Sequence, residues 1–243
     1  ALLDARRHNF LAALAEAEAA FGLAWLDVST GEFQVQAIDL TSLSEALARV
    51  DPGELILPDR LLGRAELEQA LAGWDGMSTP LPAGRFDSES ARRRLQDHYG
   101  VRSLDSFGSF TRAEIAACGV VLDYVALTQQ GRMPRLGAPA RLAAGTRMEI
   151  DAASRRNLEI DRSVSGERDG SLLGVIDLTV TGAGARALAA RLAAPMTQPE
   201  PIRDRQDALD FLRRDEDLRE DVRETLARCP DLARALSRLT LGR

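Results

Sequence analysis

The feature that most constrains the fold is a change of sequence pattern near residue 140. Before residues 131–140, GRMPRLGAPA, patterns typical of strands alternate with patterns typical of helices, whereas after them strand patterns almost disappear. The two prolines and two glycines of that segment interrupt helices and strands alike. We therefore expect an α/β domain over residues 1–135 and a mainly α domain over residues 136–243.

The first part shows strand patterns separated by turn residues. Residues 32–38, EFQVQAI, alternate apolar and polar side chains as a half-buried strand does. Residues 23–28 form an apolar run, and the Ser29-Thr30-Gly31 stretch that follows is typical of a hairpin turn. Further strands are expected over residues 8–14 and 54–58, with a helix over residues 42–50. This order of elements predicts a mixed sheet.

Capping residues delimit two longer helices in the middle of the chain. Asp87 is a typical cap for a helix over residues 88–99, and Gly100 is a typical residue to close it. Residues 111–114, TRAE, fit a capping box, in which Thr and Glu satisfy two backbone amides at a helix start. We expect the second helix to end at Gly131.

The second part carries helix patterns over most of its length. Its strand signals are short: residues 148–150, MEI, and the apolar run at residues 175–180. Asp151 is a typical cap for the segment that follows it. Helices are expected over residues 182–193, 201–214, 216–228 and 230–240.

The inventory of reactive side chains excludes several chemistries. All 31 residues counted as Lys or Arg are Arg, so the chain offers neither a Schiff-base lysine nor the lysine of a P-loop. A zinc site would need Cys118, Cys229, His8 and His98 to converge from distant positions, so we expect none. Two cysteines without a disulfide framework suit a reducing, cytoplasmic location. We find no apolar run long enough for a membrane span.

The charge distribution bears on nucleic-acid binding. Residues 1–140 hold 13 Arg and 19 acidic residues, and residues 141–243 hold 18 of each. Neither part therefore has the positive excess of a free-standing DNA-binding module.

Residues 182–187, GAGARA, match the glycine pattern of dinucleotide-binding sites. The pattern needs a strand before it and an acidic residue about 20 positions later at the end of another strand. The region that follows, APMTQPEPIRDRQ, is typical of a loop. The alternative is a helix start capped by Thr181, with small residues for close packing.

Asp27 offers a second catalytic hypothesis. A carboxylate that ends an apolar strand can hold a metal ion in ribonuclease-H-type nucleases, which need further carboxylates nearby. Glu54 could approach across a sheet, and Asp87 or Glu89 could add a third group. The alternative is that Asp27 bonds its own turn.

Residues 92–94 are three consecutive arginines on the helix that follows Asp87. Three successive helical residues cannot all point one way. They are either a solvated face or a contact for an acidic partner or phosphate, which Arg binds with its fork of donors. Arg155 and Arg156 carry the same alternatives, with Glu159 as an internal partner.

Several segments together resemble the MutS family of bacterial DNA mismatch sensors. They are residues 21–33, 88–100, 151–160 and, most specifically, 171–209. In the last block an apolar turn precedes a Thr-capped helix, a proline break and an Arg-Gln helix. The resemblance covers nearly the whole chain, although the family's mismatch-wedging Phe-x-Glu motif and Walker lysine are absent from it.

The resemblance implies a fold for each part. Residues 1–135 resemble the family's connector domain, a ribonuclease-H-like α/β unit without nuclease activity. Residues 136–243 resemble the start of the helical core, or lever, domain that joins connector, clamp and ATPase domains. We therefore expect apolar helix faces to be exposed within residues 141–243, where the rest of the lever would pack.

The resemblance also implies a function. The parent protein would bind mismatched DNA as a homodimer, hydrolyse ATP with Mg²⁺ and recruit MutL in the bacterial cytoplasm. This chain would be non-catalytic, without a cofactor or metal of its own, and would pass signals between domains. The helix at residues 88–100 corresponds to the MutL contact surface, so the candidate contacts are Arg92, Arg93, Arg94 and Asp97. Relatives often carry two Gln where this chain has Arg93 and Arg94, and charged residues there would suit an acidic partner.

Overall fold

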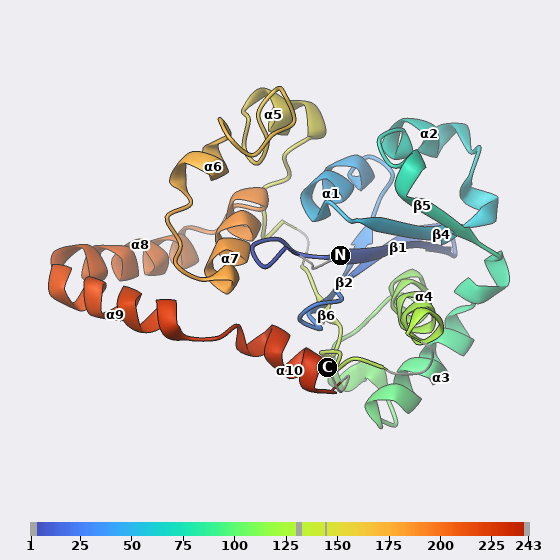
Figure 1. Cartoon of the computed structure of the whole chain (residues 1–243). Coiled ribbons are helices and arrows are strands. Elements are labelled where there is room, and N and C mark those ends of the chain that lie inside the picture. The colour runs from blue at the N-terminus through green and yellow to red at the C-terminus, as the bar shows by residue number, and fades with distance from the viewer. Residues whose placement is uncertain (1–3, 130–132, 144, 241–243) are drawn as a thin grey trace. The chain divides into compact units, whose positions relative to one another are not determined.

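The computed structural model describes residues 4–129, 133–143 and 145–240 (Figure 1). The chain divides into two compact units. The α/β unit comprises Asn9–Ala144 and Leu236–Arg243, and the helical unit comprises Ala1–His8 and Gly145–Ala235. The beginning of the chain therefore belongs to the helical unit, which the sequence patterns do not predict.

A six-stranded sheet forms the centre of the α/β unit, in the order β5-β4-β1-β2-β3-β6. The first three strands are antiparallel neighbours, β4 and β5 continue the sheet parallel to β1, and β6 pairs parallel with β3. The strand bounds are β1 Phe10–Ala17, β2 Ala20–Asp27, β3 Phe33–Ile38, β4 Glu54–Pro58, β5 Ser78–Leu81 and β6 Ala140–Arg141. The expected mixed sheet is therefore confirmed.

Helices cover both faces of this sheet (Figure 1). Helices α1 (Leu43–Val50) and α2 (Ala65–Leu71) pack on one face, and α3 (Ser88–Tyr99) and α4 (Arg112–Thr128) on the other. A hydrophobic core lies on each face of the sheet, and successive strand residues point into opposite cores. Trp25 is therefore buried among the α1 and α2 side chains, and Leu26 among those of α3 and α4. Short 3-10 helices occupy Asp59–Leu61, Asp75–Met77, Ala83–Phe86 and Leu104–Ser106.

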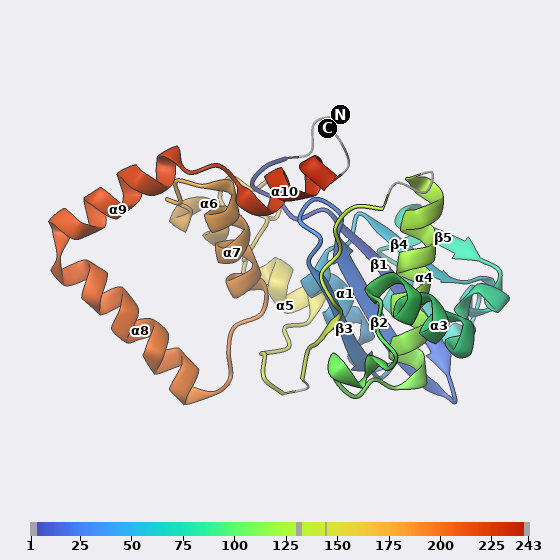
Figure 2. The same ribbon diagram turned by 90° about the horizontal axis from the view of Figure 1, so that it is seen from below.

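The described part of the helical unit consists of helices and loops (Figure 2). The bounds are α5 Ala152–Asn157, α6 Leu172–Ile176, α7 Gly182–Ala193, α8 Pro199–Arg214 and α9 Glu216–Arg228, followed by α10 Leu232–Thr240. Neither α8 nor α9 buries a residue, and Leu209 and Phe211 of α8 are 68% and 62% exposed. The expected exposed apolar side chains are thus confirmed. Across the described ranges, we find no helix long and apolar enough to cross a membrane.

Two strand signals of the second part are wrong. Residues 148–150 form no strand, because the pairing there is a single bridge between Arg147 and Met196. The apolar run at residues 175–180 begins inside helix α6 and continues as a loop. Both stretches are too short for periodicity to identify a strand, and they lie at the surface, where Met148 and Leu178 are 48% and 74% exposed.

The proline- and glycine-rich segment packs on the α/β unit where it is described. The Gly137 amide donates to the Gly31 carbonyl at 2.8 Å, and the Tyr99 hydroxyl donates to the Gly137 carbonyl at 2.7 Å. At Gly31, where φ is +80°, a Cβ would lie 2.1 Å from the Arg135 carbonyl oxygen, so both backbone conformation and space demand glycine. Helix α4 ends at Thr128, and the expected end at Gly131 lies outside the described residues.

Candidate protein interaction site on helix α3

Helix α3 has the bounds that its capping residues predict. The Asp87 carboxylate accepts a hydrogen bond from the Ser90 amide at 2.8 Å, and hydrogen bonds from the Ser90 side chain and backbone lower the pKa of Asp87. Gly100 ends the helix with a φ of +65°. The helix is therefore set in place by its own sequence at both ends.

Close packing against α4 sets which way α3 faces. Ala91 and Leu95, one turn apart, are its buried residues. A Cβ added to Gly119 of α4 would lie 2.3 Å from the Cβ of Ala91, so the two helices touch at a point where only glycine and a small residue fit. The opposite face of α3 is consequently turned to solvent.

The three arginines point in different directions, as expected from their succession. Arg94 is turned to α4, where its Nη1 donates to the Gly119 carbonyl at 2.9 Å and its Nε lies 3.6 Å from an Asp123 carboxylate oxygen. Arg93 and Asp97 are exposed, and Arg92 is half-buried. The structure thus places three of the candidate contacts on an accessible surface and gives Arg94 a structural partner.

Neighbouring charges leave the outer arginines available. Asp123 also accepts from Arg85 at 2.7 Å, and Arg112 pairs with Glu18 at 2.6 Å. Within the described ranges, Arg92 and Arg93 form no ion pair, and the charge of Arg93 contributes to the lowered pKa of Asp87. An available guanidinium on a rigid helix can bind a carboxylate through two parallel hydrogen bonds.

The carboxylates of the nuclease hypothesis do not converge. Asp27 is fully buried and accepts hydrogen bonds from the Ser29 amide at 2.9 Å and the Ser29 hydroxyl at 2.5 Å, as an aspartate does in its own turn. In the sheet register Asp27 pairs with Phe10 while Glu54 pairs with Leu11. Successive strand residues face opposite sides, so Asp27 and Glu54 lie on opposite faces of the sheet.

Glu54 has partners of its own on the α4 face. Its Oε1 accepts from the Tyr124 hydroxyl at 2.5 Å and from the Thr79 hydroxyl at 2.6 Å. Asp87 caps α3, and Glu89 lies 3.7 Å from Arg112. Each candidate carboxylate is thus engaged in a different local structure.

The glycine motif at residues 182–187 starts a helix without a strand before it. Helix α6 and a loop precede it, and the Thr181 hydroxyl accepts from the Gly184 amide at 2.9 Å. A Cβ on Gly182 would lie 2.7 Å from the Ala5 carbonyl oxygen. The dinucleotide hypothesis therefore lacks its strand, and the alternative of a capped, closely packed helix start describes the structure.

The remaining reactive side chains are dispersed. Cys118 is buried, which raises the pKa of its thiol, and Cys229 is exposed. Among the described residues, no group of His, Cys, Asp and Glu is arranged to hold a metal ion. Arg155 is buried and donates to the Ala193 carbonyl at 2.8 Å, whereas Glu159 accepts from the Val164 amide at 2.8 Å.

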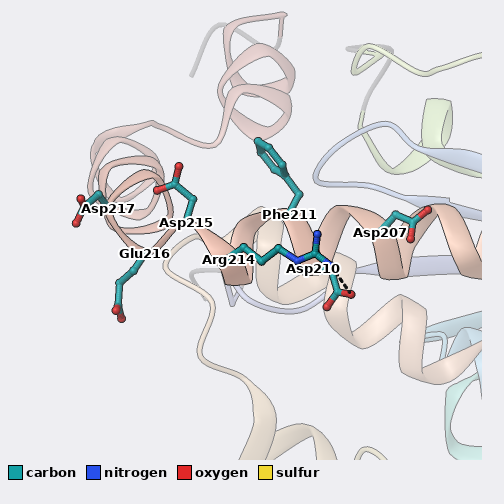
Figure 3. Close-up of a pocket in the computed structure, with 7 residues that line it drawn as sticks. All are labelled: Asp207, Asp210, Phe211, Arg214, Asp215, Glu216 and Asp217. Atoms are coloured by element: carbon teal, nitrogen blue, oxygen red, sulfur yellow. Dashed lines mark ion pairs between the residues drawn. The ribbon is translucent and has the colours of Figure 1, made fainter.

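A shallow pocket lies where α8 turns into α9 (Figure 3). Asp210 lies 3.4 Å from Arg213 and 3.9 Å from Arg214, and the exposed Phe211 ring adds an apolar wall. The acidic side chains of Asp207, Asp215 and Asp217 point in different directions in Figure 3. This arrangement brings no catalytic set together.

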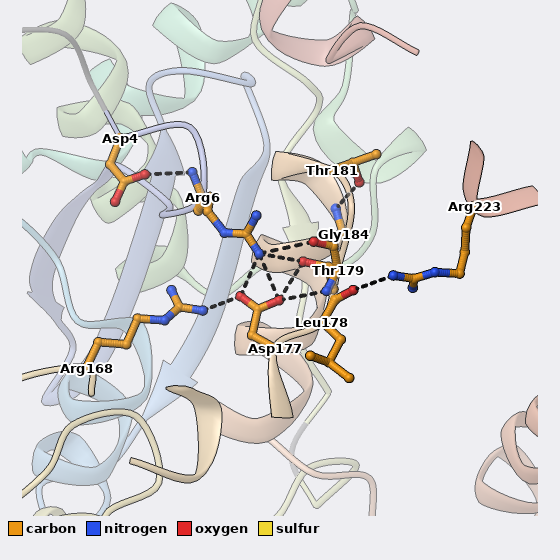
Figure 4. Close-up of polar contacts among 9 residues, drawn as sticks. All are labelled: Asp4, Arg6, Arg168, Asp177, Leu178, Thr179, Thr181, Gly184 and Arg223. Atoms are coloured by element: carbon orange, nitrogen blue, oxygen red, sulfur yellow. Dashed lines mark hydrogen bonds and ion pairs between the residues drawn. The ribbon is translucent and has the colours of Figure 1, made fainter. Parts of the chain in front are cut away.

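A polar cluster in the helical unit is the feature that the sequence analysis missed. Asp177, in the loop after α6, binds the side chains of Arg6, Arg168 and Thr179 (Figure 4). Arg6 and Asp177 are 171 positions apart, so no local pattern could have linked them. The one available signal was an aspartate inside an apolar run.

The fold defines the class of protein, which has an α/β unit and a helical unit. Residues 9–137 match the family model of MutS domain II, and residues 153–243 match that of MutS domain III. The chain belongs to the MutS family. The resemblance found in the sequence is thus confirmed.

Curated relatives agree with this assignment. The chain is 49% identical to the DNA mismatch repair protein MutS of Azorhizobium caulinodans, 48% to that of Paracoccus denitrificans and 49% to that of Cereibacter sphaeroides. Each comparison covers 100% of this chain and 27% of the relative. The chain therefore spans about 27% of the length of these relatives.

Proposed function

We propose that this chain is the connector and lever part of a DNA mismatch-repair protein, and that it transmits signals between domains without catalysing a reaction. The observation that carries this proposal is the match to MutS domains II and III over residues 9–137 and 153–243. In the whole protein, partners would include mismatched DNA and a second subunit, and the location would be the cytoplasm.

ATP hydrolysis with Mg²⁺ belongs, in this proposal, to another part of the protein. The chain has no lysine and so cannot supply the residue that reaches the phosphates in a P-loop. No step of that reaction is assigned to the residues described above.

The proposed connector and lever correspond to the two domains expected from the sequence. Residues 1–135 would be the connector, and an antiparallel three-stranded meander extended by parallel strands supports a ribonuclease-H-like fold for it. Residues 136–243 would be the lever. The exposed apolar side chains of α8 and α9 are suited to packing against further helices of the same domain.

The exposed face of α3 is the proposed contact for MutL. Its support is the accessible Arg93 and Asp97, with Arg92 beside them, on a helix whose orientation is fixed by packing on α4. The positive charge of the exposed Arg93 would favour an acidic patch on the partner. Long-range attraction of this kind mainly accelerates association.

The test is the affinity of the full chain for MutL after Arg93→Glu. We expect the dissociation constant to rise about tenfold, mostly because association is slower. The association rate of the variant should no longer depend on salt concentration. Arg94 is left intact because it holds α4 through Gly119. Arg203→Glu, which makes the same charge change at an exposed arginine of α8, is the matched control. Equal affinities for the two variants would disprove the site.

A further inference from the structure

Residues Asp4–Arg7, which we call the strap, are held by side chains of the helical unit to which they belong. Figure 4 shows the contacts of Arg6. None of the four strap residues is buried, so polar contacts rather than apolar packing hold them. A segment held this way can open without unfolding the helices it binds.

The strongest contact is the ion pair between Arg6 and Asp177. Arg6 Nη2 lies 2.9 Å from each Asp177 carboxylate oxygen and also donates to the Thr179 hydroxyl at 2.8 Å. The Asp177 side chain is only 4% exposed, whereas that of Arg6 is 41% exposed. The receiving carboxylate is therefore built into the helical unit, and the arginine reaches it from the surface.

Asp177 is also held by partners other than Arg6. Its carboxylate accepts from the Thr179 amide at 3.1 Å and forms an ion pair with Arg168 from the preceding loop. Such support from neighbouring hydrogen bonds holds an acceptor in the geometry that a guanidinium requires.

Two more arginines recognise the backbone of the strap. Arg186 of α7 donates to the Ala5 carbonyl at 2.6 Å while its other nitrogen binds Asp231 at 2.8 Å. Arg234 of α10 donates to the Asp4 carbonyl at 2.9 Å and to the Arg7 carbonyl at 2.7 Å. Three carbonyls and one side chain of four consecutive residues are thus bound.

Glycine at position 182 makes room for the strap. A Cβ there would lie 2.7 Å from the Ala5 carbonyl oxygen and 3.5 Å from the Ala5 side chain. The glycine motif that resembled a dinucleotide site therefore has a use in this chain, which is the close approach of another backbone.

We propose that Asp177, Arg186 and Arg234 form a segment-binding site whose occupant is the strap, and that the Arg6–Asp177 pair is its latch. When the latch is closed, only His8 and Asn9 lie between the strap and Phe10, where β1 begins. Opening adds the four strap residues to this connection, or about 13 Å of extended chain. The site thus controls how much free chain precedes the α/β domain.

Trypsin tests the latch on the intact chain, since it cleaves after Arg6 and Arg7 only when the strap leaves its site. Arg6→Ala should increase the rate of cleavage after Arg7 by about 10- to 100-fold, the range expected for losing a charge-assisted hydrogen bond. Asp177→Asn should do the same, and Arg6→Lys should have a smaller effect. Asp169→Asn, at an exposed aspartate in the same loop region, should change nothing.

Two results would overturn the proposal. An unchanged rate after Arg7 in both Arg6→Ala and Asp177→Asn would show that the ion pair does not hold the strap. An equal acceleration at Arg203 and Arg213 of α8 would show that Asp177 stabilises the whole helical unit instead of latching one segment.

Discussion

At the scale of single residues, neighbours decide what each charged side chain can do. Arg93 and Arg94 are adjacent and identical, yet one faces solvent and the other donates to the Gly119 carbonyl. Asp27 and Asp177 both follow apolar runs. The first bonds its own turn through Ser29, and the second receives an arginine from the start of the chain. Residue type alone therefore does not identify a site.

The pKa of Asp177 gives the latch a predicted dependence on pH. Burial raises this pKa, but hydrogen bonds from Thr179 and Arg6 outweigh burial and lower it from 3.8 to about 2. Arg6 and Arg168 are the charged groups that face the carboxylate. The folded state therefore binds fewer protons than the unfolded state between about pH 4 and pH 2, so the stabilisation is lost as the pH falls through that window.

Denaturant unfolding of the chain and of its Asp177→Asn variant measures this effect. The difference in free energy of unfolding between the two proteins should be constant near pH 6 and should shrink below pH 4. If the difference in free energy of unfolding does not change down to pH 2, the partners of Asp177 do not stabilise its ionised carboxylate.

At the scale of elements, capping residues predict where helices begin, whereas sequence patterns predict edge strands poorly. Helices α3 and α4 begin where Asp87 and Thr111 place them, because each cap is formed by residues three positions apart. Strand β5 contains Pro80, which is typical of turns and is tolerated here because β5 lies at the sheet edge. No sequence pattern indicates this strand or the two-residue β6.

The same contrast holds for the candidate site. The helix carrying Arg93 could be placed from its caps, but which arginine faces outward depends on the packing of Ala91 against Gly119. That contact joins residues 28 positions apart in sequence, and no periodicity within α3 reveals it. The strap was missed for the same reason, since its partners lie at the other end of the chain.

Packing of α3 on α4 makes a prediction at this scale. Gly119→Ala should lower the free energy of unfolding by about 1–3 kcal/mol, since its methyl group would meet Ala91 at 2.3 Å and push the helices apart. Gly84→Ala is the control, because a Cβ there meets nothing within 4 Å. Chemical denaturation measures both, and equal stabilities would refute the close contact.

At the scale of the whole molecule, the described chain passes from the helical unit to the α/β unit after His8, returns to the helical unit at Gly145 and enters the α/β unit again at Leu236. Domains II and III of the MutS family account for most of its residues, and the curated relatives are several times longer. An α/β domain with an exposed arginine face, joined to a helical domain with exposed apolar helices, has surfaces suited to contacts outside itself. In the proposed function, the α3 face is the surface that binds MutL.

Site-directed crosslinking tests that claim most directly. In a Cys229→Ser background, which removes the exposed thiol and keeps the buried Cys118, Arg93→Cys would supply the thiol that carries a photoreactive group, with Arg60→Cys as the control. We predict that MutL crosslinks from position 93 and not from position 60. Crosslinking from position 60 alone, or equally from both, would contradict the placement of the MutL contact on α3.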